Sequence, residues 1–169
     1  TEKQLLRPSN YPLGVPGKGF NIYNKKNINI GVINICGVVY MEPLRSAFEF
    51  ILDIINIINK ETKIIIVDFH AEATAEKQAM FWYLDGKISL LFGTHTHIIT
   101  ADEKISKNGT GFITDVGMTG SSEGVIGMKK DSVLKRFIFH LPSRYEVELN
   151  NPELNGIIAS IDESTGKTL

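Results

Sequence analysis

Two histidines, His95 and His97, stand one residue apart in the segment GTHTH, directly after the apolar run ISLLF. A third, His70, closes the segment IIIVDFH. Neutral imidazole is the commonest side-chain ligand for metals. Residues i and i+2 of an extended segment share a face, with Cα atoms about 7 Å apart, which suits ligands of one ion or of two ions about 3.5–4 Å apart. The three histidines therefore predict a metal site; the alternative is that they are hydrogen-bonded structural residues.

Three carboxylates are candidates to accompany these histidines. Asp68 precedes His70 by two residues, so we expect it on the same face as a ligand or as an orienting partner. Asp115, in the segment ITDVGMTG, follows another short strand and is placed to accept a hydrogen bond from the second nitrogen of a histidine. For both, a role as a cap or loop carboxylate stays open. Glu72 is interpreted as a solvated loop carboxylate.

The elements that must position these side chains alternate between strands and helices. Short apolar runs rich in β-branched residues predict buried strands at 28–35, 63–67 and 88–92. Apolar residues at three- and four-residue steps predict a helix from 44 to 58, after Pro43, and a second helix spans 74–84 with Thr74 as its N-cap. This order predicts an α/β fold with largely parallel central strands. Ligands of such sheets collect at the carboxyl ends of the strands, where all three histidines are expected.

The second half of the chain continues with shorter elements. Asn108-Gly109 predicts the turn of a hairpin over 104–114. A helix is expected over 131–139, with strands near 144–149 and 157–162. Because no internal repeat or linker is evident, residues 1–169 are expected to form a single domain.

Composition excludes several classes of function. The chain of 169 residues is 43% hydrophobic with a formal net charge of −1, which gives no electrostatic footprint for nucleic acid or anionic membranes. No apolar run approaches the roughly 20 residues of a membrane span. The single Cys36 excludes an internal disulfide and a multi-cysteine zinc site, and agrees with a reducing cytoplasm.

Other candidate residues are given structural interpretations. The segment GVPGKG lacks Walker spacing, because position 12 is Pro12 and neither Ser nor Thr follows the lysine. His140 has no partner histidine nearby in the sequence and is interpreted as structural. The remaining residues are interpreted as a solvated helix face (Lys129, Lys130, Lys135, Arg136) or as packing residues (Trp82, Tyr83).

The segments DFHAE, GTHTH, TADE and ITDVGMTG, in this order and spacing, resemble the bacterial YmdB-like metallophosphoesterases, a family of 2′,3′-cyclic-nucleotide 2′-phosphodiesterases. The likeness runs from LRPSNYP to about GIIASID. It implies a calcineurin-like metallophosphoesterase fold, a β-sandwich flanked by helices, with two transition-metal ions, iron or manganese. It also implies that His70 and His95 bind one ion and His97 the other. The reaction would cleave the bond to the 2′-oxygen and leave a 3′-nucleotide.

The chain departs from the family at its beginning. Family members open with a strand carrying a Gly-Asp motif, followed by an acidic Asn-containing motif and a Gly-Asn-His motif, and this chain contains none of these. The resemblance is therefore to the later portion of the fold. We expect the remaining ligands and the general acid to lie in an N-terminal segment that the chain lacks, so that this chain alone is inactive.

Two other functions stay open at this point. One is a catalytically inactive nucleotide-binding regulatory module of the same fold. The other is a mononuclear metal hydrolase, because three histidines can hold a catalytic zinc ion with one open position. The expected partner is a small phosphodiester or a cyclic nucleotide, not a membrane or duplex nucleic acid. Whether the protein forms a homo-oligomer stays open.

Overall fold

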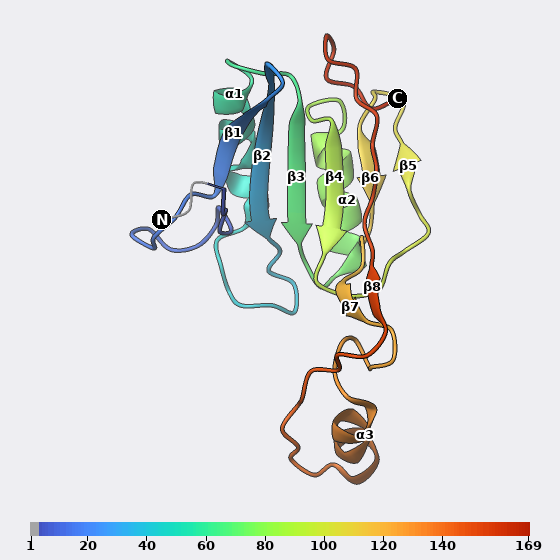
Figure 1. Cartoon of the computed structure of the whole chain (residues 1–169). Coiled ribbons are helices and arrows are strands. Elements are labelled where there is room, and N and C mark those ends of the chain that lie inside the picture. The colour runs from blue at the N-terminus through green and yellow to red at the C-terminus, as the bar shows by residue number, and fades with distance from the viewer. Residues whose placement is uncertain (1–3) are drawn as a thin grey trace.

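The computed structural model describes residues 4–169 and centres on a six-stranded mixed sheet (Figure 1). In chain order the strands are β1 (Phe20–Lys25), β2 (Ile28–Cys36), β3 (Ile65–His70), β4 (Leu90–Thr94), β5 (Lys104–Ile105) and β6 (Gly111–Ile113). Their order across the sheet is β1-β2-β3-β4-β6-β5. The central strands β2, β3, β4 and β6 are parallel, and the two edge strands are antiparallel to their neighbours. The predicted α/β class with parallel central strands is confirmed.

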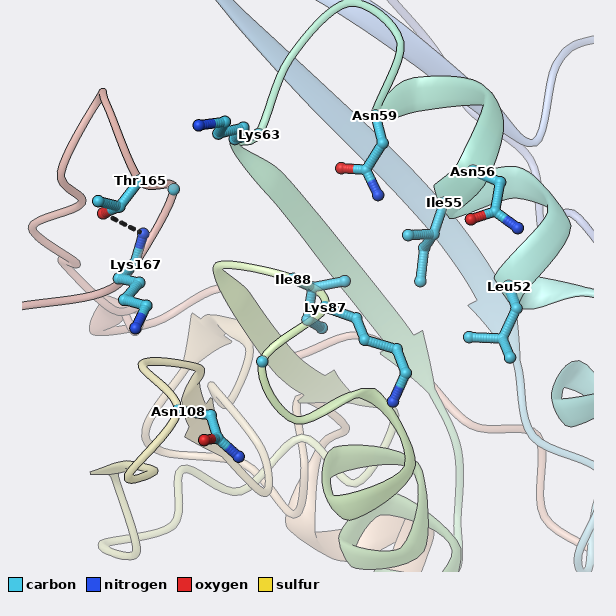
Figure 2. A pocket seen from close by; sticks show the side chains of 12 residues that line it. Leu52, Ile55, Asn56, Asn59, Lys63, Lys87, Ile88, Asn108, Thr165 and Lys167 are labelled. Carbon is cyan, nitrogen blue, oxygen red and sulfur yellow. Dashed lines mark hydrogen bonds between the residues drawn. The ribbon is translucent and has the colours of Figure 1, made fainter.

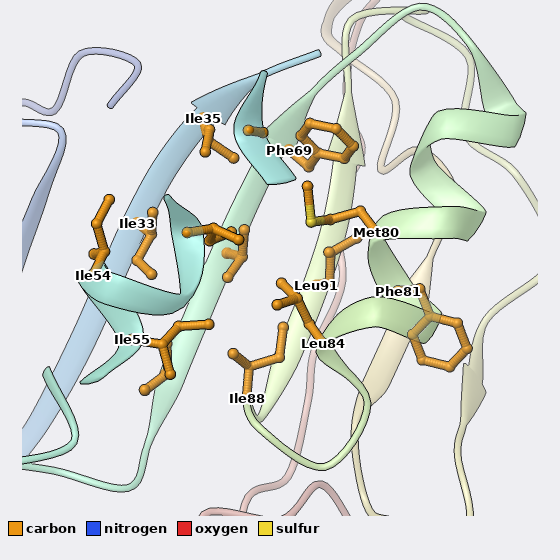
Figure 3. Close-up of a cluster of buried hydrophobic side chains, with 14 of the residues drawn as sticks. Ile33, Ile35, Ile54, Ile55, Phe69, Met80, Phe81, Leu84, Ile88 and Leu91 are labelled. Atoms are coloured by element: carbon orange, nitrogen blue, oxygen red, sulfur yellow. The ribbon is translucent and has the colours of Figure 1, made fainter. Parts of the chain in front are cut away.

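The hydrophobic core lies between this sheet and two helices on one of its faces, α1 (Ile51–Ile58) and α2 (Thr74–Leu84) (Figures 1 and 3). Ile35 and Phe69 point from the strands into this layer, where they and Met80 of α2 are fully buried. Full burial of such a side chain contributes about 1.5–3 kcal/mol. Since successive residues of a strand alternate between faces, the neighbours of these core residues lie on the face away from the helices.

That opposite face carries a polar cluster near the carboxyl ends of the strands. Asn34 of β2 stands beside Asp68 of β3 in the strand register, and His70 of β3 stands beside Thr94 of β4. All four are only partly buried. The strand alternation therefore places Asp68 and His70 on the same face, as predicted.

The predicted helix over 44–58 forms only in part. A short 3-10 turn at Ala47–Glu49 comes first, and α1 begins at Ile51. The buried side chain of Asn10 donates to the Arg45 carbonyl at 3.0 Å, which occupies an acceptor that a helix would use. The helix over 74–84 is confirmed, but its N-cap is Ala73, without a side-chain capping bond, so the prediction for Thr74 is wrong.

Strand β1 was not predicted. It pairs with β2 through a turn at Lys26 and Asn27, both of which have positive φ, and this pair lacks the glycine that usually marks such turns. The hairpin over 104–114 is confirmed as β5 and β6. The strands expected near 144–149 and 157–162 reduce to isolated bridges at Val147 and Ile161.

After the large sheet the chain extends away from it and then returns. Strands β7 (Thr119–Ser121) and β8 (Pro152–Leu154) pair antiparallel and lead to α3 (Lys130–Phe139), which lies apart from the sheet at the bottom of Figure 1. We call residues 122–151 the arm. After β8 the chain crosses the face opposite the helices, in front of β6, and Thr168 there donates to the Ser89 carbonyl.

Two further findings concern the whole described chain. Residues 4–169 contain one large sheet and the two-stranded β7-β8 sheet, so this part of the protein does not show the two-layer sandwich that the resemblance implied. None of its helices is long and apolar enough to cross a membrane.

Candidate metal centre

Parallel strands β3 and β4 end side by side and bring two of the three histidines into contact. His70 is the last residue of β3, and His95 follows directly after β4. The Nε2 atom of His70 lies 3.1 Å from Nδ1 of His95, with the two rings nearly perpendicular. The sequence predicted all three imidazoles at this edge of the sheet, and the geometry brings two of them, His70 and His95, into contact.

A threonine hydroxyl determines which nitrogen of His70 carries its proton. The Thr94 hydroxyl donates to Asp68 Oδ1 at 2.8 Å, so it can only accept from His70 Nδ1, which lies 3.0 Å away. The lone pair of neutral His70 is therefore on Nε2, which faces His95. Burial, followed by the charge of His95, lowers the pKa of His70 and favours this neutral form.

Asp68 acts on His70 through Thr94. Its second oxygen accepts from Asn34 Nδ2 at 2.8 Å, so both carboxylate oxygens are engaged by protein donors. Burial raises the pKa of Asp68, although these hydrogen bonds oppose the shift. Of the two predicted roles, ligand or orienting partner, the contacts favour the orienting partner.

Glu72 is an exposed loop residue, as interpreted, but it also takes part in the cluster. Its Oε2 lies 3.0 Å from Nε2 of His95, and both side chains are partly exposed. A carboxylate at this distance favours a proton on Nε2, which leaves the lone pair of neutral His95 on Nδ1. The sequence places Glu72 two residues after His70, but only the loop path shows that it meets His95.

These tautomers set two lone pairs against each other across 3.1 Å. The conflict is removed either by a second proton on His95 or by a cation that both nitrogens bind. Metal–nitrogen bonds of about 2.0–2.1 Å place two ligand nitrogens about 2.8–3.4 Å apart for angles between 90° and tetrahedral. The spacing and chemistry of His70 and His95 therefore fit a shared metal ion.

His97 lies apart from this pair. Its side chain is exposed, and its Nδ1 donates to the Ile126 carbonyl of the arm at 3.1 Å, so Nε2 carries the lone pair. Among the described residues, neither a hydrogen bond nor a ring contact joins His97 to His70 or His95. Within residues 4–169 no group of three or more His, Cys, Asp or Glu residues is arranged to hold a metal.

Asp115 supports the loop between the two histidines. Its Oδ2 accepts from the Thr96 amide at 3.0 Å and from Lys77 Nζ at 2.9 Å, and its Oδ1 accepts from the Gly117 amide at 2.9 Å. Burial acts to raise the pKa of Asp115, but these hydrogen bonds outweigh it and hold the pKa below its ordinary value. The expected contact with a histidine ring nitrogen is replaced by this contact with the loop backbone.

Three consecutive residues of α2 that the sequence analysis missed hold the surroundings of the site. Glu76 accepts from the Val38 amide in the loop after β2, and Lys77 pairs with Asp115. Gln78 donates to Asp102 Oδ2 at 3.3 Å and to Thr114 Oγ1 at 3.2 Å. The sequence does contain an indication of this role: a helix that packs against a sheet cannot expose three consecutive residues, so at least one of these polar side chains has to be buried with a partner.

A cavity of about 440 Å³ opens at the other edge of the sheet and contains none of the histidines (Figure 2). Its lining includes Lys63, just before β3, and Ile88, just before β4, so it lies at the amino ends of these strands. Lys87 and Lys167 also line it. The cavity and the histidine cluster are therefore separate.

Comparison with known proteins gives matches along the whole chain. The model of the YmdB-like protein family matches residues 1–169. A curated relative from Bacillus subtilis, named 2′,3′-cyclic-nucleotide 2′-phosphodiesterase, is 43% identical over 165 residues, which cover 98% of this chain and 62% of that protein. The chain thus spans less than two thirds of the length of this relative.

Two solved structures share the fold. One is described as a novel phosphatase from Mycoplasma pneumoniae, with a TM-score of 0.90 and 31% identity over 99% of this chain and 62% of that one. The other is a hypothetical protein from Thermus thermophilus, with a TM-score of 0.81 and 32% identity over 89% of this chain and 64% of that one.

Proposed function

The chain belongs to the YmdB-like protein family, and from that membership we propose that the whole protein is a metal-dependent phosphodiesterase acting on 2′,3′-cyclic nucleotides or related phosphodiesters. The name of the Bacillus subtilis relative supports this substrate class. The observation that carries the proposal is the approach of His70 Nε2 to within 3.1 Å of His95 Nδ1, a spacing that fits two ligands of one metal ion. The protein acts in the cytoplasm, which its single cysteine favours.

In this proposal His70 and His95 hold one transition-metal ion and His97 holds a second, with iron or manganese as the metals. When bound, such ions neutralise charge on phosphoryl oxygens and lower the pKa of water. Asp68 and Thr94 keep the lone pair of His70 on Nε2. Glu72 accepts from Nε2 of His95 and so keeps the lone pair of His95 on Nδ1. These contacts set both ligands before a metal or substrate arrives.

The test combines metal analysis with hydrolysis by the full-length protein, including any sequence outside residues 1–169. We expect about two transition-metal ions per chain and metal-dependent hydrolysis of 2′,3′-cyclic AMP that gives the 3′-nucleotide. His97→Ala should abolish hydrolysis, because it removes the ligand of one ion. The matched control is His140→Ala, since His140 is exposed at the end of α3.

Two results would contradict the proposal. One is turnover by a metal-free preparation of the His97→Ala variant. The other is a complete absence of bound metal after reconstitution with iron or manganese.

The second candidate is a nucleotide-binding regulatory module without catalysis. The separation of His97 from His70 and His95 favours it, because two histidines alone hold a metal centre weakly. It predicts that calorimetry detects nucleotide binding to the full-length protein while no product forms. Metal-dependent hydrolysis would exclude it.

A further inference from the structure

The segment His95–His97, which we call the histidine loop, adopts a backbone that its own residues disfavour. His95 has φ +107° and His97 has φ +68°. Residues with a Cβ rarely occupy this half of conformational space, and they persist there only where the surroundings hold them. Contacts from outside the loop must therefore fix it.

The strongest such contact meets the loop at its centre. The amide of Thr96, between the two histidines, donates to Asp115 Oδ2 at 3.0 Å. Just after Asp115, the Val116 amide donates at 3.0 Å to the carbonyl of Gly93 in β4, the strand that leads into the loop. One bond thus holds the centre of the loop and the other holds the strand that leads into it, so we infer that the position of the Asp115 carboxylate sets the path of the loop.

Asp115 is in turn positioned by Lys77. Lys77 Nζ donates to the same oxygen, Oδ2, at 2.9 Å, and neither side chain has any exposure to solvent. Among the described residues this carboxylate is the one hydrogen-bond partner of the Lys77 ammonium. A buried charge of either sign is strongly unfavourable without its partner. The pair therefore keeps Asp115 ionised and in place beneath Thr96.

The route of Lys77 to Asp115 depends on Gly93. A Cβ built on Gly93 would come within 2.9 Å of Lys77 Cδ, so the lysine stem passes where β4 has no side chain. Helix α2 thereby reaches the histidine loop through the gap that this glycine leaves. The AEKQ segment of α2 and the GTHTH segment are therefore in contact, through Lys77 and the space beside Gly93.

We propose that Lys77 is a positioning residue for the metal centre: through Asp115 it fixes the histidine loop in the conformation that presents His95 and His97. The proposal rests on the proposed function in so far as these histidines bind metal. The competing interpretation is that the buried pair only stabilises the fold. The two differ in what happens when both charges are removed together.

The experiment compares four variants of the full-length protein: Lys77→Met, Asp115→Asn, the double variant, and Lys87→Met. The last is the matched control, since Lys87 follows the same helix but is exposed and bonds the Tyr83 carbonyl. The first readout is hydrogen exchange of the Thr96 amide without metal. The second is Co²⁺ affinity and the visible absorption of bound Co²⁺.

We expect the Thr96 amide to exchange about tenfold faster or more in all three variants of the pair, as for loss of a hydrogen bond to a charged acceptor. In the double variant, the amide side chain that replaces the Asp115 carboxylate offers one acceptor oxygen instead of two, so the Thr96 and Gly117 amides compete for it. Co²⁺ affinity should fall about 10–100-fold, with a changed absorption spectrum, because the ligands lose their support. Lys87→Met should match the wild type.

Each outcome has one meaning. A folded double variant with wild-type exchange and wild-type Co²⁺ affinity would overturn the proposal and leave the pair as a fold stabiliser. If a single variant fails to fold, the double variant, which buries no unpaired charge, decides the question. If the wild type binds no Co²⁺, the proposed metal function fails, while exchange of the Thr96 amide in metal-free Lys77→Met still decides whether Lys77 positions the loop.

Discussion

At the scale of single residues, the candidate centre depends on groups that touch neither metal nor substrate. The Thr94 hydroxyl has one proton, and by giving it to Asp68 it determines that His70 presents Nε2 toward His95. From the sequence alone, a threonine at the end of a strand is interpreted only as a β-branched residue that favours the strand. Here its hydroxyl defines the tautomer of a proposed ligand.

Thr94→Val tests this role with little change in side-chain volume. Without the hydroxyl, Asp68 loses a donor and His70 loses the acceptor for Nδ1–H, so Mn²⁺ affinity should fall about 10–100-fold. Calorimetric titration of the full-length protein with Mn²⁺ measures the loss. Thr119→Val is the control, because Thr119 is an exposed residue of β7 outside the cluster around His70 and His95. Equal Mn²⁺ affinity in the two variants would refute the assignment of the tautomer to Thr94.

The sequence could predict the histidines and the nearby carboxylates Asp68 and Asp115, but not the contacts that Glu72 and Lys77 make. His70, His95 and His97 follow apolar runs, and the end of a buried strand is a place where side chains meet. Glu72 and Lys77 reach their partners through a loop path and a strand register that no short-range pattern encodes. A lysine inside a helical segment is normally read as solvent-exposed.

At the scale of elements, close contact between β4 and β6 leaves no room for a side chain at Gly93. A Cβ there would overlap the Thr114 carbonyl oxygen, which belongs to the backbone and cannot rotate away. The parallel pairing and the passage of Lys77 thus require glycine at the same position. The alternation of strands and helices was predictable, because the spacing of apolar residues along the chain indicates it. The close approach of Gly93 to the Thr114 carbonyl was not predictable, because it depends on how two strands pack together.

Gly93→Ala should therefore destabilise the protein by about 3 kcal/mol or more, since the added methyl group forces the backbones of β4 and β6 apart. Urea unfolding followed by circular dichroism measures the change. Gly156→Ala is the matched control, because a Cβ there meets nothing within 4 Å, and it should change the stability by about 0.5 kcal/mol or less. Similar midpoints for the two variants would show that the sheet tolerates a side chain at Gly93.

At the scale of the whole molecule, metal binding and folding are linked, because the centre joins elements from distant parts of the sequence. His70 ends β3, His95 follows β4, and Lys77 of α2 pairs with Asp115, which bonds the amide of Thr96 between His95 and His97. A ligand that binds only the folded protein stabilises it by mass action. A bound metal ion should thus link the carboxyl ends of β3 and β4 and stabilise the folded protein.

Mn²⁺ at about 100 times its dissociation constant should stabilise the full-length protein by about 2.7 kcal/mol, which corresponds to a rise in Tm of about 5–10 °C. Differential scanning calorimetry with and without Mn²⁺ measures the shift. In His70→Ala the shift should be largely lost, because one of the two facing nitrogens is gone. An undiminished shift in that variant would place the bound Mn²⁺ elsewhere in the protein.

Within residues 4–169, one hydrogen bond joins the arm to the histidine loop: His97 Nδ1 donates to the Ile126 carbonyl at 3.1 Å. Its two ends close on each other, since the Ser122 amide donates to the Asn151 carbonyl at 3.1 Å. Because every amino acid offers the same carbonyl, substitutions along the arm leave this contact intact as long as the path of the backbone is kept. The exposed side chains of the arm can therefore vary without loss of this hydrogen bond. An insertion or deletion near Ile126, by contrast, would displace the carbonyl that His97 bonds and so change the position of the His97 ring.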